Sequence, residues 1–351
     1  MDKVLTIIVP AYNMEMYLRY CLDSLCISRY EECLEVLVVN DGSKDATSSI
    51  AHEYADEYPE IFKVIDKENG NYGSCINAAV PVAVGKYIKV VDADDSVDTQ
   101  NLEGFISFLR ENDVDLALSD FILVDENRNE IGRISYNWGK CVMPMQEICI
   151  TERFQNMEMH AVAYRRQLLL CSGYRQTEGI SYTDQQWIFA PMIDVRTVGA
   201  FNKPVYQYLV GRVGQTIDPV VKMKKMPERI KNVLDMAILY DKLCHRVTVE
   251  MKSYLDARIR PNVQDIYITY FSNISKFDKQ VIHQFDEDLH QFAPVLYNYI
   301  GTCSSYIKIW RSLASCSRVA EVAFCKVFAI VLWLKVSFSS HRGFPVNGES
   351  K

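Results

Sequence analysis

The sequence lacks the features that mark nucleic-acid-binding and zinc-binding proteins. Its 38 Lys and Arg are outnumbered by 45 Asp and Glu, which leaves a net charge of −7 on 351 residues and no basic excess for a phosphate backbone. Its 11 cysteines include no C-x-x-C pair, and its 6 histidines are not clustered at zinc spacing. We therefore expect no nucleic-acid partner, and we interpret the cysteines as free thiols in a reducing cytoplasm.

Long hydrophobic runs are also missing. The apolar run near the first residue is too brief for a secretory signal and has the length of a strand. The sharpest apolar stretch, 327–334, is closed on both sides by Lys326 and Lys335, whereas a membrane-spanning helix needs about 20 apolar residues. The pattern therefore predicts a cytoplasmic chain without a simple spanning helix in this stretch.

The first third of the chain alternates strand-like and helix-like segments. With 49% hydrophobic and 24% charged residues, the chain has enough apolar material for a packed core. Strands separated by helices are typical of parallel sheets, which bind ligands beyond the carboxyl ends of their strands. We predict an α/β fold with a mostly parallel, Rossmann-like central sheet flanked by helices. The expected strands are 4–9, 34–39, 61–65, 87–91 and 116–124.

The pattern changes twice further along the chain. After Asp125 a polar turn leads into a mixed segment, and after Asp218 helices rich in Lys, Arg and Met follow. We expect one domain over 1–220, divided near residue 125, and a helical region over 221–351.

Three carboxylates crowd the end of the expected strand 87–91. Asp92, Asp94 and Asp95 are too close together to be stable as anions without a cation or hydrogen-bond donors. Oxygen ligands with little histidine nearby favour Mg²⁺ or Mn²⁺, which often bridge the phosphates of a substrate. The alternative is a solvated acidic turn, with Asp98 capping the following helix.

Another carboxylate, Asp41, follows the expected strand 34–39, where Gly42 permits close approach. It could accept the imide N–H of a uracil while backbone donors bind the carbonyls of the base. The alternative is an ordinary turn in which Asp41 or Ser43 caps the next helix.

Several segments together resemble a known family. IIVPAYNMEMYLRYCLDSL, LEVLVVNDGSKDAT and KENGNYGSCINAAVPVAVGKYIKVVDADDSVD are similar, in the same order, to the donor half of family 2 glycosyltransferases with the GT-A fold. Further on, EGISYTDQQW and YQYLVGRVGQTID look like acceptor-side motifs of bacterial members. The resemblance covers roughly the first 220 residues and implies a nucleotide-sugar donor half over 1–125 and an acceptor half over 126–220.

The resemblance also implies roles for individual residues, with Mg²⁺ or Mn²⁺ as cofactor. Two departures from the family pattern bear on which nucleotide or sugar fits. Asn40 stands where an acidic residue is common, and Asn71 and Tyr72 interrupt a loop that often has glycine. The implied roles, in chain order, are the base pocket for Pro10, Ala11 and Tyr12, uracil binding for Asp41, the nucleotide loop for Asn69, the ribose for Asp92, the cation for Asp94, the general base for Asp184, and the diphosphate for Arg212 and Gln215.

Three residues of the acceptor half keep two interpretations each. Asp184 would begin a helix whose dipole favours the ionised form that a base needs, or it is only a helix cap. We interpret His160 as a hydrogen-bonded structural residue, with contact to the acceptor or the diphosphate as the alternative. Trp187 either stacks on a sugar face or packs in the core.

The segment 306–338 mixes basic and aromatic residues in the pattern of an amphipathic helix. Such a helix suits the inner face of the cytoplasmic membrane, where anionic lipid attracts Lys and Arg. The alternative is a helix packed on the catalytic domain or on a second copy of the chain in a homo-oligomer.

These observations predict metal-dependent, inverting transfer of a sugar from a UDP-sugar to a hydroxyl of a glycan or lipid-linked acceptor, in the synthesis of cell-surface polysaccharide. Inversion follows from the resemblance and from one evident base without a nucleophile. A nucleotidyltransferase is one alternative, but PAYNMEM lacks the Gly and Lys that such enzymes generally carry after the first strand. A catalytically degenerate nucleotide-binding protein is another, and the absence of G-x-G-x-x-G after the first strand argues against a dehydrogenase.

Overall fold

The computed structural model describes residues 3–181, 183–212 and 219–340. The chain divides into two compact units. The first comprises residues 1–232 with 246–258, and the second comprises 233–245 with 259–351. Helices α10 (Met226–Leu243) and α11 (Val249–Ser272) contribute residues to both units.

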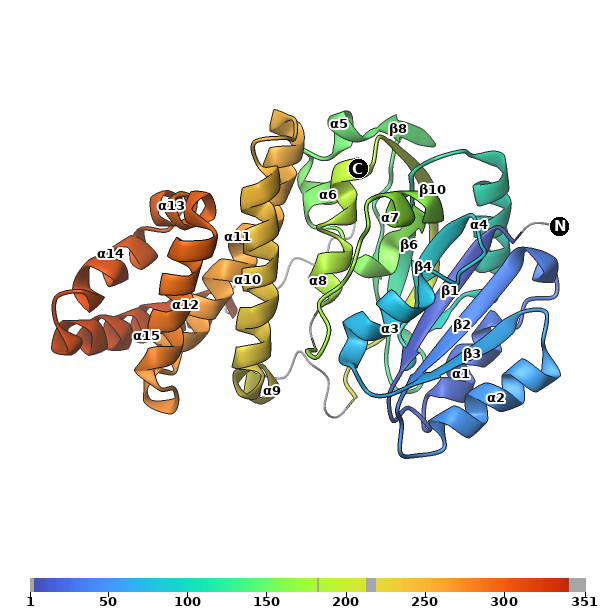
Figure 1. The fold of residues 1–351 in the computed structure, drawn as a ribbon, viewed down its shortest axis with the longest axis horizontal. Coiled ribbons are helices and arrows are strands. Elements are labelled where there is room, and N and C mark those ends of the chain that lie inside the picture. Colours follow the sequence, from blue (N-terminus) through green and yellow to red (C-terminus); the bar gives the residue numbers. More distant parts are fainter. Residues whose placement is uncertain (1–2, 182, 213–218, 341–351) are drawn as a thin grey trace. The chain divides into compact units, whose positions relative to one another are not determined.

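A mixed sheet forms the centre of the first unit (Figure 1). Its strand order is β3-β2-β1-β4-β9-β6-β10-β5, with β7 beside β6 and β8 beside β10. The strands are β1 (Leu5–Ala11), β2 (Leu34–Asp41), β3 (Phe62–Lys67), β4 (Tyr87–Val90), β5 (Ser96–Val97), β6 (Leu116–Val124), β7 (Glu130–Ile134), β8 (Val142–Pro144), β9 (Val162–Arg165) and β10 (Thr197–Leu209).

The parallel order predicted for the first strands is confirmed. β1 pairs with β2 and β4 in parallel, and β2 pairs with β3 in parallel. Beyond β4 the sheet is mixed, because β9 runs antiparallel to both β4 and β6 before β6 and β10 pair in parallel. The carboxyl ends of β1 to β4 therefore meet at one edge, where the candidate residues follow the strands.

Burial explains why β1 and β2 read as continuous apolar runs. Every residue of both strands is buried, as expected for inner parallel strands with helices on both faces. Helices α2 and α3 pack against this part of the sheet, and α4 packs against β10. The helices and 3₁₀ turns (η) of this unit are α1 (Leu18–Leu25), η1 (Glu31–Cys33), α2 (Thr47–Glu57), α3 (Asn71–Ala79), α4 (Thr99–Glu111), α5 (Met145–Ile148), α6 (Glu152–Gln155), η2 (Met159–Ala161), α7 (Arg166–Cys171), α8 (Asp184–Trp187), η3 (Pro191–Asp194) and α9 (Pro219–Lys224).

The second unit is helical in the part that the structure describes. Besides its share of α10 and α11 it contains η4 (Ile274–Lys276), α12 (Lys279–Phe292), α13 (Pro294–Cys303), α14 (Ser305–Ala314) and α15 (Arg318–Ser340). Aromatic rings form its core: Trp310 packs against Tyr267 and Phe271, with centroids 5.6 and 5.7 Å apart. No described helix is long and apolar enough to cross a bilayer.

The terminal segment forms two helices where the sequence pattern indicates one. The helical segment is interrupted between α14 and α15. The buried side chain of Glu321, on α15, links this second helix to the first. Its carboxylate accepts hydrogen bonds from Trp310 Nε1 on α14 at 3.1 Å and pairs with His283 Nε2 on α12 at 3.0 Å. α15 is thereby held against its own unit by one buried acid.

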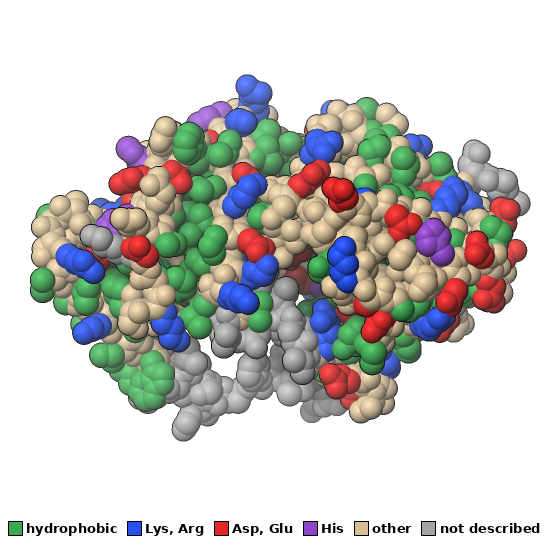
Figure 2. All heavy atoms as spheres, turned by 60° about the horizontal axis from the view of Figure 1, so that its bottom comes forward, with side chains coloured by type: hydrophobic (Ala, Val, Ile, Leu, Met, Phe, Trp, Pro, Cys, Tyr) green, Lys and Arg blue, Asp and Glu red, His purple; other side chains and the backbone are tan. Residues whose placement is uncertain are grey.

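Charges are interspersed on the face drawn in Figure 2. Blue Lys and Arg side chains alternate with red Asp and Glu over that view, and neither colour forms a continuous field.

Candidate functional site

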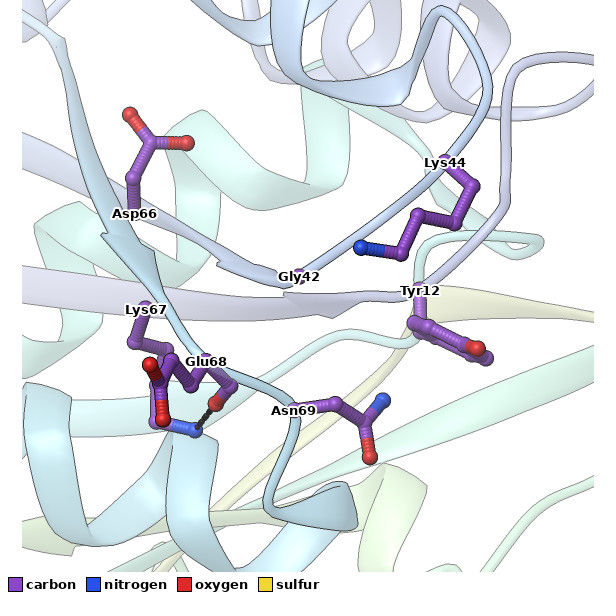
Figure 3. A pocket seen from close by; sticks show the side chains of 7 residues that line it. All are labelled: Tyr12, Gly42, Lys44, Asp66, Lys67, Glu68 and Asn69. Carbon is purple, nitrogen blue, oxygen red and sulfur yellow. Dashed lines mark hydrogen bonds between the residues drawn. The ribbon is translucent and has the colours of Figure 1, made fainter.

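A pocket of about 630 Å³ opens at the carboxyl edge of β1, β2 and β3. Figure 3 shows Tyr12 and Lys44 approaching it from the loops after β1 and β2, and Lys67, Glu68 and Asn69 from the end of β3. The full lining is Tyr12, Gly42, Lys44, Asp66, Lys67, Glu68 and Asn69.

Two of the residues expected in this pocket contribute only indirectly. Pro10 and Ala11 are buried inside β1, opposite Val39 and Asn40 of β2, and do not line the pocket. Their strand position places Tyr12, which is partly exposed, at the pocket wall.

Asp41, at the end of β2, is 2% exposed and already has partners within the chain. Its Oδ1 accepts hydrogen bonds from Lys67 Nζ at 2.7 Å and from the backbone N–H of Gly70 at 2.9 Å. The adjacent Gly42 has a φ of +71°, and a Cβ there would lie 2.9 Å from the backbone nitrogen of Asn69. Only glycine therefore lets the β2 turn and the β3 loop approach this closely.

The two departures from the family pattern have local explanations. Asn40 Nδ2 donates a hydrogen bond to Asp66 Oδ1 at 2.7 Å. An ionised acid at position 40 could not donate this bond to the Asp66 carboxylate. Asn71 has a φ of +64°, a conformation that asparagine tolerates better than most residues and that glycine adopts freely. Tyr72 turns toward the acidic cluster, where its OH donates to Asp92 Oδ1 at 2.9 Å.

In the part of the chain that the structure describes, the acidic cluster after β4 places three carboxylates near a single ion-pair partner, Arg212. Burial raises the pKa of Asp92 to about 7, and the neighbouring Asp94 and Asp184 carboxylates add to the rise. Asp95 is fully buried, and burial also raises its pKa. Its two oxygens accept hydrogen bonds from Tyr206 OH at 2.5 Å and from the backbone N–H of Leu209 at 2.7 Å.

Asp94 is held by arginine. The Arg212 guanidinium forms an ion pair with its carboxylate, and Arg128 donates to its backbone carbonyl at 3.3 Å. Arg128 also lies over the ring of Tyr20, 3.9 Å from the centroid. The structure thus brings Arg212 to the acidic cluster from the far end of β10, while Gln215 lies outside the described residues.

His160 lies under the cluster, in η2. Its ring packs on Tyr206 and Tyr208, each with centroids 4.6 Å away, and its Nδ1 is buried without a hydrogen-bond partner. Its backbone carbonyl accepts from the buried Lys89 Nζ at 2.5 Å. Burial, helped by Lys89, lowers the pKa of His160 to about 3, so the imidazole is neutral and able to bind a metal.

A divalent cation fits the donor groups present here. Among the described residues, ligand atoms of Asp92, Asp95 and His160 all lie within 4.8 Å of one another. Carboxylate oxygens with one neutral imidazole suit Mg²⁺ or Mn²⁺. Asp94, the expected ligand, is absent from this group because its carboxylate faces Arg212.

Asp184 is the first residue of α8, and the helix cap before it is Thr183. The Asp184 carboxylate lies close enough to the acidic cluster to raise the pKa of both Asp92 and Tyr72. Residues far apart in the sequence therefore share one charged region.

Trp187 has two interpretations, contact with a sugar or packing in the core. It is 1% exposed, and its ring packs edge-on against Tyr164 and Tyr174 at centroid distances of 5.1 and 5.8 Å. This burial agrees with the core-packing interpretation.

Comparison with known proteins agrees with this arrangement. Residues 6–172 match the family described as "Glycosyl transferase family 2". These residues belong to glycosyl transferase family 2. The match covers the pocket and the acidic cluster but stops short of Asp184 and Arg212.

Curated relatives of this family 2 domain match it over short segments. Glycosyltransferase GlyA of Streptococcus pneumoniae serotype 4 is 34% identical over 126 residues, which are 36% of this chain and 18% of GlyA. The minor teichoic acid biosynthesis protein GgaB of Bacillus subtilis is 33% identical over 115 residues, which are 32% of this chain and 13% of GgaB. The aligned parts thus span less than a fifth of either relative.

A solved structure extends the likeness in fold. Residues 1–349 of TarS from S. aureus, crystallised in complex with UDP-GlcNAc, match with a TM-score of 0.65 and 18% sequence identity, covering 95% of this chain and 92% of that one. The GT-A fold that the sequence predicts is thereby confirmed.

Sequence reasoning missed the partners of the key carboxylates. The only sequence signal for Lys67 is that it ends a strand at the same edge as Asp41. Tyr72 was noted only as a departure, although the first turn of a helix after a strand end is a position that faces a ligand. Arg128 had no sequence signal beyond its place in a polar turn.

Proposed function

We propose that this family 2 member transfers a sugar from a UDP-sugar to a hydroxyl of a glycan or lipid-linked acceptor, with inversion, in the synthesis of cell-surface polysaccharide. The observation that carries the proposal is the electrostatic proximity of Asp184 to Asp92, because it joins a base to a nucleotide-binding edge. The teichoic acid relative GgaB and the UDP-GlcNAc bound to TarS support the classes of acceptor and donor.

The donor half, 1–125, binds the nucleotide in this proposal. The base enters the pocket beside Tyr12 and Asn69, and Asp92 binds the ribose. The pair between Asp41 and Lys67 then lies behind the base, and Asp41 exchanges Lys67 for the imide N–H of the uracil. Arg212 exchanges Asp94 for the diphosphate, which carries more negative charge.

The acceptor half, 126–220, supplies the base. Asp184 removes the proton of the acceptor hydroxyl as that oxygen attacks the anomeric carbon, and UDP leaves from the opposite face. A cation bound at the acidic cluster would neutralise the departing diphosphate. We propose Asp94 as its ligand, while His160, whose buried Nδ1 has no hydrogen-bond partner, lies beside the cluster.

A cytoplasmic location is part of the proposal. The described cysteines are free thiols, which suits a reducing compartment.

Release of UDP tests the proposal. The purified chain is incubated with individual UDP-sugars and Mg²⁺ or Mn²⁺, with EDTA in a parallel reaction, and UDP is quantified with and without glycan or lipid-linked acceptors. We expect cation-dependent UDP release from one donor, and NMR of the product should show the inverted anomer. Release of pyrophosphate in place of UDP would favour a nucleotidyltransferase, and binding without turnover would favour a degenerate member.

A further inference from the structure

The last described helix, α15, exposes an apolar face. Its outward residues recur at spacings of three and four, as one face of a helix requires, while Cys325 and Glu321 point inward and are buried. Phe324 and Phe328 pack inward on Phe271, with centroids 5.5 and 5.3 Å away. The exposed apolar side chains are Val319 at 80%, Val327 at 60%, Ile330 at 59%, Val331 at 47%, Trp333 at 66% and Leu334 at 40%.

The distribution of apolar side chains on α15 is the opposite of that on an ordinary surface helix. A helix that packs on a globular core buries its apolar stripe and shows polar residues to water. Here the outward stripe is as apolar as the inward one, and it carries an exposed tryptophan. An apolar face of this kind marks a contact with a membrane or another macromolecule.

The exposed charged side chains that the structure describes on α14 and α15 are basic. Lys308, Arg318 and Lys326 are exposed on α14 and α15, and Lys326 lies within the apolar stripe itself. The single acid between 305 and 340, Glu321, is buried and bonded to Trp310 and His283. A locally basic face stands out on a chain whose net charge is −7.

We propose that α15 lies flat on an anionic lipid bilayer, with its apolar stripe below the headgroups and Lys326 and Arg318 at the lipid phosphates. A helix with this composition binds in the interface plane through buried apolar area together with attraction to anionic lipid. No described helix could cross the bilayer, so the contact is peripheral.

Charge argues against a second copy of the chain as the occupant. A symmetric dimer places the same patch of both copies face to face. Lys326 would then meet a surface on which the described part of 305–334 offers no exposed carboxylate, so like charges would be desolvated together. Anionic phosphates neutralise these charges instead.

Trp333 makes the proposal directly measurable. The other three tryptophans, Trp138, Trp187 and Trp310, are all buried, so a change in tryptophan emission on binding reports mainly on Trp333. We expect vesicles of phosphatidylcholine with phosphatidylglycerol to shift the emission of the full chain to the blue and to protect it from acrylamide. Vesicles of phosphatidylcholine alone should do much less. Trp333→Phe should remove the spectral change while the protein still sediments with anionic vesicles.

Variants separate the apolar from the electrostatic contribution. The double variant Ile330→Ser/Trp333→Ser should bind anionic vesicles at least about tenfold more weakly, and Lys326→Gln about fivefold more weakly at low salt. Val249→Ser, which changes an equally exposed apolar residue of the first unit, is the matched control and should bind as wild type does. All of these positions are at the surface, so circular dichroism should show unchanged folding.

Three outcomes would overturn the proposal. Equal binding to neutral and anionic vesicles would remove the electrostatic part, and full binding by the double variant would remove α15 from the contact. A wild-type dimer in sedimentation equilibrium that Ile330→Ser/Trp333→Ser converts to monomer would assign the face to a second copy. None of these readouts requires sugar transfer, so they are independent of the proposed function.

Discussion

The acidic strand ends of β2 and β4 differ in how their charge is compensated. At β2, Asp41 is buried but bonded to the ammonium of Lys67 and to the backbone of Gly70. At β4, Asp92 receives one hydrogen bond from Tyr72 and lies beside two further carboxylates, so its pKa rises to about 7. Both strand ends lie at the same edge of the sheet, but the negative charge at β2 is compensated and the negative charge at β4 is not fully compensated.

This difference indicates a separate role for each strand end. A compensated carboxylate holds loops in place, as Asp41 does for the loop after β3. A cluster with too few cations stores repulsion that a bound divalent ion and substrate can relieve. Chemistry is therefore expected at β4, and stability and nucleotide fit at β2.

The strongest test of this division is Asp184→Asn. Removing the carboxylate of Asp184, the proposed base, should lower turnover about a thousandfold without unfolding the chain, because general base catalysis contributes that order of rate. Steady-state UDP release at saturating donor measures it. Asp194→Asn, an exposed acid in the nearby η3, should keep wild-type turnover. An Asp184→Asn chain with near-normal turnover would move the base elsewhere.

The β2 end should respond in stability. Lys67→Met leaves the buried Asp41 carboxylate without its cation and should lower the free energy of unfolding by about 3 kcal/mol. Urea titration gives the value. Lys44→Met removes an exposed lysine from the same pocket and serves as the control, and a loss of equal size in both variants would contradict the comparison.

The β4 end should respond to cations in a pH-dependent way. Without a cation, folded Asp92 keeps its proton up to about pH 7, whereas the unfolded chain ionises it near pH 4. The folded state binds more protons between these values, so this group's contribution to stability is lost as the pH rises from about 4 to 7. Mg²⁺ or Mn²⁺ binds the ionised form and should raise Tm by about 3 °C at pH 8 and by little at pH 5.

Differential scanning fluorimetry at both pH values measures this cation effect. Asp92→Asn and Asp94→Asn should each reduce it, and His160→Gln shows whether the free imidazole nitrogen takes part. Equal stabilisation at pH 5 and pH 8 would mean that the cation does not bind at the carboxylates.

The smallest expected effect belongs to Tyr72. Tyr72→Phe removes one hydrogen bond to Asp92, worth about 1 kcal/mol, and should raise KM for the donor about fivefold with little change in kcat. Tyr58→Phe, a tyrosine exposed on the surface, is the control. A fall in kcat with KM unchanged would place Tyr72 with the base and not with the nucleotide.

The local sequence predicted the strands and helices better than the contacts between residues that lie far apart in the chain. The runs of β1, β2 and β6 were found because inner strands are apolar along their whole length, and the crowding of Asp92, Asp94 and Asp95 was visible without any structure. The ion pair of Arg212 with Asp94 joins residues 118 positions apart, which no local pattern reports. Trp187 illustrates the reverse case, because the local sequence of an aromatic residue near a helix start is compatible with both ligand contact and core packing.

The amino-acid sequence by itself determined the strand and helix pattern of the donor half and the strand ends at which chemistry-bearing residues appear, because periodicity and turn chemistry act over a few neighbouring positions. Only the tertiary structure decided which carboxylate is neutralised by Lys67, which is left with Tyr72 alone, and which side of α15 faces water. Those outcomes depend on distances between segments that the sheet brings together, and charge compensation and burial are properties of such distances.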